Sequence, residues 1–162
     1  MLRAAAILFL SLAAWPACAG CADSAREKVD WQRCWFSEQD MAGADLRGAK
    51  LRDAAFIRAD LTGADLTGAD AYSARFINAK LDNARFDTAR LINADFTGAE
   101  LSGASFRQAD LRDAHLSRAI ARGADFTGAL LAGANFNETD FTGAIWTDGR
   151  KRCGERSIGA CR

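Results

Sequence analysis

The sequence predicts a solenoid, a fold in which one short repeat is wound many times into a regular coil. Two observations carry this prediction. An alanine recurs at every fifth position nineteen times in succession, from Ala44 to Ala134. Two residues after each alanine stands an apolar residue, which we call the centre of the repeat; it is usually Leu or Phe, and it is Ala at Ala71 and Ala121. This spacing fits neither the period of an α-helix nor that of a flat strand, so a repeat architecture is favoured.

Each repeat has five positions, which we name the alanine position, the first outward position, the centre, the second outward position and the corner. From Phe36 to Trp146 the 23 centres keep a strict spacing of five, and ten are Leu and nine are Phe. We expect the alanine and the centre to point inward, because only a methyl-sized group fits beside a Leu or Phe in a narrow coil.

Corners carry residues suited to tight turns. Of the 22 corners from Gly43 to Asp148, ten are Gly and six are Asn or Asp. These residue types tolerate the positive φ that the third position of a type II turn requires. Three corners on one side, Arg58, Arg118 and Glu138, lack such residues. There we expect a different turn type.

Centres twenty residues apart collect like side chains, which predicts four repeats in each circuit. One column of centres reads Phe36, Phe56, Phe76, Phe96, Leu116 and Phe136, and another reads Leu46, Leu66, Phe86, Phe106, Phe126 and Trp146. Rings stacked one circuit apart gain offset aromatic contacts. At the spacing of hydrogen-bonded strands, about five to six circuits give a rod roughly 26 Å long.

The repeats Ala44-Asp45-Leu46, Ala94-Asp95-Phe96 and Ala134-Asn135-Phe136 are typical of the array. In this pattern the chain resembles the pentapeptide-repeat family, whose repeat is written A(D/N)Lxx. The resemblance covers residues 29–148. It implies an all-β fold, a right-handed quadrilateral β-helix with four repeats per coil, and it implies neither enzymatic activity nor a cofactor.

The first 19 residues have the three-part build of a secretory signal peptide, with a basic start, an apolar run over residues 4–14 and small residues at its end. The apolar run is too short to span a bilayer. Ala17 and Ala19 form a small-x-small cleavage signal before Gly20, whereas Ala19-Gly20-Cys21 resembles a lipoprotein box with a lipid anchor on Cys21. We expect a periplasmic or secreted protein, with a lipid-anchored outer membrane lipoprotein as the alternative.

Cysteine counting favours the first route. Cleavage after Ala19 leaves an even set suited to disulfides in an oxidising compartment, namely Cys21, Cys34, Cys153 and Cys161. We expect residues 20–28 to form an N-terminal cap segment and residues 149–162 a C-terminal disulfide cap, since the open edges of a solenoid must be covered. A metal site is not predicted, because the sequence has no CxxC pair and a single histidine, His115.

The outward columns are where a function could reside. Lys50, Asp70, Arg90 and Asp110 alternate in sign from circuit to circuit, which predicts a ladder of ion pairs. A neighbouring side is acidic: Asp40, Asp60, Asp82, Glu100 and Asp140 stand against Lys80 and Arg122. Outward apolar residues suggest an interaction patch, made of Ile57, Tyr72, Ile77 and Ile92. The basic residues of the tail, Arg150, Lys151, Arg152 and Arg156, are interpreted as part of a soluble cap.

Composition gives no electrostatic pull towards nucleic acid, since Lys plus Arg and Asp plus Glu are both 21. A coil filled with Ala, Leu and Phe offers no concave site for catalysis. We therefore expect a non-catalytic exported scaffold, a monomer or weak dimer, that binds an unknown protein or envelope partner. The alternative, also taken from the family resemblance, is a DNA-mimicking topoisomerase-binding protein, which the export signal and neutral charge disfavour.

Overall fold

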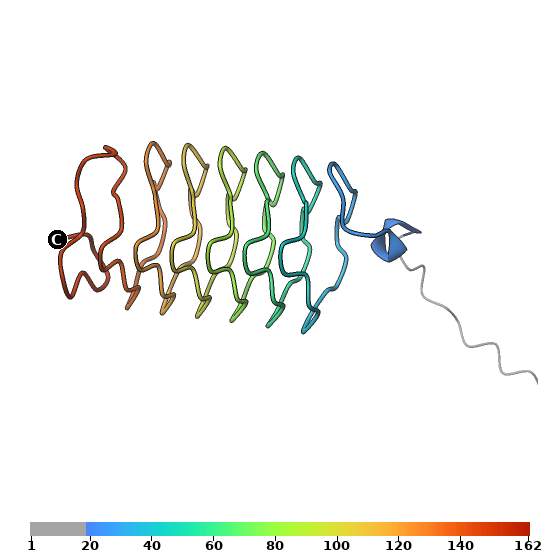
Figure 1. Ribbon diagram of the computed structural model, residues 1–162, viewed down its shortest axis with the longest axis horizontal. Coiled ribbons are helices and arrows are strands. Elements are labelled where there is room, and N and C mark those ends of the chain that lie inside the picture. Colours follow the sequence, from blue (N-terminus) through green and yellow to red (C-terminus); the bar gives the residue numbers. More distant parts are fainter. Residues whose placement is uncertain (1–18) are drawn as a thin grey trace, which may run out of the picture.

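The computed structural model describes residues 19–162, which form a rod made of stacked loops (Figure 1). The predicted signal peptide, residues 1–19, lies outside the described residues except for Ala19. Within the described range the one helical element is η1, a short 3-10 helix at Ala19–Ala22. It precedes the first circuit and lies beyond the N-terminal end of the rod (Figure 1).

The rest of the array is joined by parallel bridges between neighbouring circuits. Each first outward residue pairs with the residue twenty positions later, from Asp30 with Lys50 to Asp125 with Ile145. One circuit therefore takes twenty residues, or four repeats of five. The grouping of like centres into columns is thereby explained, because residues twenty apart lie one above the other.

Three backbone bonds per repeat hold neighbouring circuits together. In the repeat around Leu46, the Leu46 N–H donates to Asp65 O (2.8 Å), the Gly48 N–H to Thr67 O (2.9 Å), and the Asp65 N–H returns to Ala44 O (2.9 Å). A fourth bond, from Ala49 N–H to Leu46 O at 3.1 Å, closes the turn at the corner. This pattern recurs through the rod, so four of the five backbone N–H groups of a typical repeat are paired without long strands.

The expectation of a different turn type at three corners is wrong. The φ angles of Arg58, Arg118 and Glu138 are 56°, 60° and 58°, close to the 67° of Gly63. A corner N–H must point to the next circuit, as that of Arg58 does to Ile77 O (3.0 Å). Every corner from Lys28 to Gly143 has this left-handed conformation, and from Lys28 to Gly128 the ladder bond of the corner N–H imposes it whichever residue stands there.

The alanines and centres fill the coil. From Ala49 to Ala124 every residue at these two positions is at most 1% exposed. Phe56, Phe76 and Phe96 stack with centroid spacings of 5.2 and 4.9 Å. Phe86 meets both Phe76 and Phe96 edge to face, at 5.7 and 5.6 Å. The two aromatic columns thus form one interlocked core.

The tail covers part of the C-terminal end. It turns back and pairs in antiparallel fashion with the last circuit, through Asp140 with Ile158 and Ile145 with Arg152. The Phe141 N–H donates to Ser157 O at 2.9 Å, and the Gly143 N–H to Cys153 O at 2.8 Å. Residues 149–162, which we call the cap, therefore supply the final strand on two sides of the coil.

Candidate interaction surfaces

The first outward position has a structural task that the sequence analysis did not assign. The ladder leaves the N–H of the second outward residue unpaired, and the Asp or Asn two residues earlier accepts it. Asp65 accepts the Thr67 N–H at 3.0 Å, and Asp95 accepts the Thr97 N–H at 2.9 Å. The same bond is made by Asp40, Asp45, Asp60, Asp70, Asp110, Asp125, Asn135 and Asp140. Many acidic residues on the walls are therefore part of the fold rather than free binding groups.

In two repeats that lack an Asp or Asn at this position, a residue of the preceding circuit supplies the hydrogen-bond acceptor. Where Glu100 stands, Asp82 accepts the Ser102 N–H at 2.9 Å. Where Ser105 stands, Asp87 accepts the Arg107 N–H at 3.3 Å. Asp82 and Asp87 thus replace the missing acceptors from one circuit away.

These bonds and the neighbouring cations keep the acidic residues ionised. Hydrogen bonds from the Arg47 side chain lower the pKa of Asp45 to about 2, against an ordinary value of 3.8. The Arg112 side chain likewise lowers the pKa of Asp110. Partial burial opposes ionisation of Asp125, but hydrogen bonds from Thr127 and Arg107 still hold its pKa below the ordinary value.

The predicted ion ladder is broken into pairs. Asp70 pairs with Arg90 at 3.4 Å, but Lys50 pairs with Asp30 at 3.6 Å. Asp110 pairs within its own repeat, with Arg112 at 2.7 Å. Among the described residues no ion pair joins Lys50 to Asp70 or Arg90 to Asp110. A continuous ladder is therefore wrong for this column, because Lys50 and Asp70 pair in opposite directions along it and Arg112, two residues away, takes Asp110.

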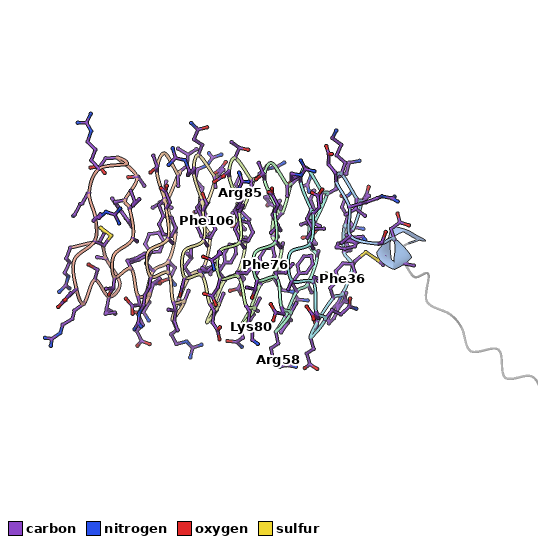
Figure 2. The ribbon with its side chains drawn as sticks, in the orientation of Figure 1. Phe36, Arg58, Phe76, Lys80, Arg85 and Phe106 are labelled. Carbon is purple, nitrogen blue, oxygen red and sulfur yellow. A yellow bond between two sulfur atoms is a disulfide. The ribbon has the colours of Figure 1, made fainter. Side chains whose placement is uncertain are left out.

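The acidic side is largely engaged. Asp60 pairs with Lys80 at 3.8 Å, and Asp140 with Arg122 at 2.6 Å. Asp82 is held by Ser102, as described above. Figure 2 shows Lys80 and Arg58 on the outer surface, while Phe36, Phe76 and Phe106 lie inside the coil.

The four residues of the predicted apolar patch lie on two neighbouring sides. Ile57 and Ile77 occupy the same column one circuit apart, and each side chain is half-buried. Tyr72 and Ile92, also half-buried, stack on the adjacent side. The guanidinium groups of Arg52 and Arg90 lie over the Tyr72 ring, 5.1 and 5.3 Å from its centroid. The patch thus consists of two short aliphatic strips and a ring already contacted by cations.

The most exposed large apolar side chain of the described residues lies outside the predicted patch. Trp35 is 67% exposed and stands at a first outward position of the first circuit. The guanidinium of Arg75, two circuits further along the same column, lies 5.1 Å from its ring centroid. The phase of the repeat, extended back from Phe36, would have placed this indole outside.

Both ends of the rod carry a disulfide. Cys21 of η1 is bonded to Cys34, with a Cα–Cα distance of 5.5 Å. Cys153 is bonded to Cys161 within the cap, at 4.8 Å. Cys34 fills an alanine position and is 1% exposed, and Cys153 is 3% exposed. Each bond therefore ties a terminal segment to the buried end of the coil.

Over residues 19–162 no three His, Cys, Asp or Glu side chains come together in a way that could hold a metal ion. In the same range, no helix has the length and apolar character needed to cross a membrane.

Two family models match this chain. The model described as "Pentapeptide repeat region" matches residues 69–146, and "Pentapeptide repeats (8 copies)" matches residues 40–75. The chain belongs to the pentapeptide-repeat family. Solved pentapeptide-repeat proteins form right-handed quadrilateral β-helices, which agrees with the twenty-residue circuit observed here.

Solved structures in this family are similar in fold. A trypsin-treated variant of QnrB1, a plasmid-mediated fluoroquinolone resistance protein, is 21% identical with a TM-score of 0.55, and the match covers 76% of this chain and 74% of that chain. A second trypsin-treated variant of QnrB1 is 22% identical with a TM-score of 0.51, over 76% and 70%. Rfr23 from the cyanobacterium Cyanothece 51142 is 23% identical with a TM-score of 0.46, over 75% and 91%. No curated protein matches the sequence. At these identities the likeness to QnrB1 is one of fold alone.

Proposed function

We propose that this pentapeptide-repeat protein is an exported, non-catalytic scaffold that presents its flat sides to a protein or envelope partner in the periplasm or outside the cell. The observation that carries the proposal is the pair of disulfides, one at each end of the rod, because such bonds persist in oxidising compartments. The predicted signal peptide supports the same compartment.

The Cys21–Cys34 bond also favours cleavage before Gly20 over the lipoprotein route. A lipid anchor would be attached to the sulfur of Cys21, and that sulfur is already bonded to Cys34. One sulfur cannot hold both groups, so a disulfide-bonded protein is released rather than anchored.

The walls support a scaffold rather than an enzyme. Acid–base catalysis uses side chains that converge on one site and have pKa values shifted towards the working pH. Here the shifts of the carboxyl groups of Asp45, Asp60 and Asp110 all lower the pKa, and each group has a structural partner. Such groups stay ionised and occupied at neutral pH.

The test combines three measurements on the full chain expressed with its N-terminal segment. Cell fractionation should recover the protein outside the cytoplasm, mass spectrometry should show a free Gly20 amine, and thiol titration should find no free cysteine in the native protein. Cross-linking in intact cells should then capture an envelope partner. Recovery only in cytosolic complexes with a topoisomerase, or a lipid on Cys21, would overturn the proposal.

A further inference from the structure

Two arginines on neighbouring sides of the rod lie on aromatic rings rather than on carboxylates. The guanidinium of Arg75 lies 5.1 Å from the centroid of the Trp35 ring, and that of Arg52 lies 5.1 Å from the centroid of the Tyr72 ring. Within residues 19–162 neither side chain forms an ion pair or donates a hydrogen bond. The rings hold these guanidinium groups in place, and their N–H donors are free to bind an anion.

These residues meet at one edge that runs along the rod. Arg52 and Tyr72 stand at second outward positions of one side, and Trp35 and Arg75 stand at first outward positions of the next side. The exposed corner residue Arg33 belongs to the column between them. We call these five residues the ring–arginine surface. Its arginines come from three successive circuits, one from each.

Unpaired cations are concentrated on this surface. From Lys28 to Asp148, the arginines of the surface are three of the four cations that have no ion pair among the described residues, and Arg118 is the fourth. In the first three circuits of the same two sides, Asp53 is the one carboxylate without an ion pair in that part of the chain. The other three carboxylates are neutralised, Asp30 by Lys50, Glu38 by Arg58 and Asp70 by Arg90. The surface therefore attracts anions.

Trp35 gives this surface an exposed ring. The indole is 67% exposed, whereas Ala55, which stands between Trp35 and Arg75 in the same column, is 0% exposed. The Arg75 side chain passes over Ala55 to reach the indole, so the ring and the guanidinium lie side by side on the wall. The half-buried side chains of Ile57 and Ile77 add apolar area in the next column. Exposed apolar area of this kind marks an interaction surface.

We propose that the ring–arginine surface binds a linear polysaccharide whose sugars carry carboxylates. This inference rests on the proposed function, because export brings the rod to the polysaccharides of the envelope. The C–H groups on the face of a sugar pack on an aromatic ring, and a guanidinium binds a carboxylate through two parallel hydrogen bonds. In a uronic acid the carboxylate is attached directly to the sugar ring. A sugar stacked on Trp35 therefore brings its carboxylate within reach of Arg75.

The spacing of the circuits fits such a polymer. Stacked Phe rings of neighbouring circuits lie 4.9 to 5.3 Å apart, close to the separation of hydrogen-bonded strands. One sugar unit of an extended polysaccharide has nearly this length. A polysaccharide laid along the rod therefore places successive sugars over successive circuits, each with one arginine of the surface. An extended peptide advances about 3.3 Å per residue and does not keep this register, so an acidic peptide fits less well.

Calorimetric titration of the purified, oxidised protein with a hexamer of galacturonic acid tests the proposal. We expect binding that weakens as salt is added, because the contacts are between exposed charges. The methyl-esterified hexamer has the same sugar chain without the charges, and its dissociation constant should be about tenfold higher or more. Tryptophan emission should shift to the blue on binding of the acidic hexamer, since the exposed Trp35 ring leaves water, and Trp35→Ala should remove this shift.

Substitutions locate the site. Trp35→Ala and Arg75→Gln should each raise the dissociation constant for the acidic hexamer about tenfold. Arg118→Gln is the matched control, since Arg118 is also exposed and has no ion pair among the described residues but stands outside the ring–arginine surface. This variant should bind like the native protein. Equal thermal midpoints of the three variants show that all are folded.

Several results would overturn the proposal. These are no heat of binding with the acidic hexamer, equal affinity for the hexamer and its ester, or unchanged affinity in both Trp35→Ala and Arg75→Gln. Tighter binding of polyglutamate or of a single-stranded oligonucleotide with the same number of charges would assign the surface to a peptide or a nucleic acid instead. A failure of these titrations leaves export untouched, whereas recovery of the protein from the cytosol would overturn export without changing the measured affinities.

Discussion

The carboxylate of Asp82 accepts a hydrogen bond from the backbone N–H of Ser102, twenty residues further along the chain, at 2.9 Å. In the repeats that have Asp or Asn at the first outward position, such as those of Asp65 and Asp95, this N–H is bonded within its own repeat. Asp82 therefore joins two circuits at a point where Glu100 does not supply the acceptor.

Asp82→Ala should leave the part-buried Ser102 N–H without its acceptor, at a cost of about 1 to 2 kcal/mol in the free energy of unfolding. Asp82→Asn keeps an acceptor oxygen and should cost less. Glu100→Ala, on the same side, should change stability by under about 0.5 kcal/mol. Urea unfolding of the three variants measures the differences. Equal effects for Asp82→Ala and Glu100→Ala would show that the carboxylate acts only through its charge.

Substitutions at two corners test the left-handed backbone conformation, one by removing strain and the other by adding it. Arg118 has a φ of 60° and no ion pair among the described residues, so Arg118→Gly should relieve left-handed strain and stabilise the protein by about 0.5 to 1 kcal/mol. Gly123 has a φ of +65°, and a methyl group on its Cα would meet no atom within 4 Å. Gly123→Ala should therefore destabilise the protein by a similar amount through backbone strain alone.

Arg118→Ala, which keeps the strain, is the control for these two variants and should be nearly neutral. Denaturant titration of all three proteins gives the comparison. Destabilisation by Arg118→Gly would mean that the turn there is not left-handed in solution.

The fold was largely predictable because its signal is repeated. A one-residue slip would turn every later centre outward, so the phase from Phe36 to Trp146 specifies inside and outside without ambiguity. The turn at Arg58 could not be predicted, since its conformation is imposed by hydrogen bonds to the next circuit rather than by its own preference. The partners of the ion pairs also could not be predicted from the sequence. Whether Asp110 bonds to Arg90 or to Arg112 depends on rotamers that the spacing does not fix.

Acid should destabilise the rod in a defined range. Asp45 has a pKa of about 2 in the folded protein against an ordinary value of 3.8, and those of Asp60 and Asp110 are also lowered. A depressed folded pKa adds stability that is fully present above the unfolded value and is lost as the pH falls through the folded value. The thermal midpoint should therefore change little from pH 7 to about pH 5 and fall between about pH 4 and pH 2.

Asp45→Asn tests the assignment, because the amide oxygen can still accept the Arg47 N–H but does not titrate. Its thermal midpoint should depend less steeply on pH below about pH 4 than that of the native protein. The comparison is made by scanning calorimetry at several pH values. An unchanged slope would assign the acid sensitivity to other carboxyl groups.

The cap disulfide should contribute to stability through the unfolded chain. The bond closes a loop with a sequence separation of 8. Cross-linking so short a loop removes about 2 to 3 kcal/mol of chain entropy from the unfolded state. Cys153→Ser combined with Cys161→Ser should lower the unfolding free energy by about that amount, measured by denaturant titration under oxidising conditions. Reduction of the native protein opens the Cys21–Cys34 bond as well and should lower the unfolding free energy further, and no loss in the double variant would contradict the role.

Insertions of one, five and twenty residues into a side of the rod test three features separately: the alternation of inward and outward positions, the columns of centres, and the twenty-residue circuit. One extra residue between Asn93 and Ala94 reverses inside and outside for all later repeats, so we expect the C-terminal circuits to unfold. Five extra residues, a copy of Ala94 to Gly98, keep the inward positions but move each later centre to the next column. The first copied Phe would still lie above Phe76, but Phe106 would be 25 residues from Phe86 instead of 20, so the stacking of Phe86 on Phe106 would be lost.

Twenty extra residues, a copy of Ala74 to Asn93, keep both the phase and the columns and add one whole circuit. Because each circuit contacts only its neighbours, this protein should be at least as stable as the original. Circular dichroism and urea unfolding should rank the twenty-residue insertion first, the five-residue insertion second and the single insertion last. If the five-residue and twenty-residue proteins were equally stable, the aromatic columns would contribute nothing beyond the burial of apolar side chains.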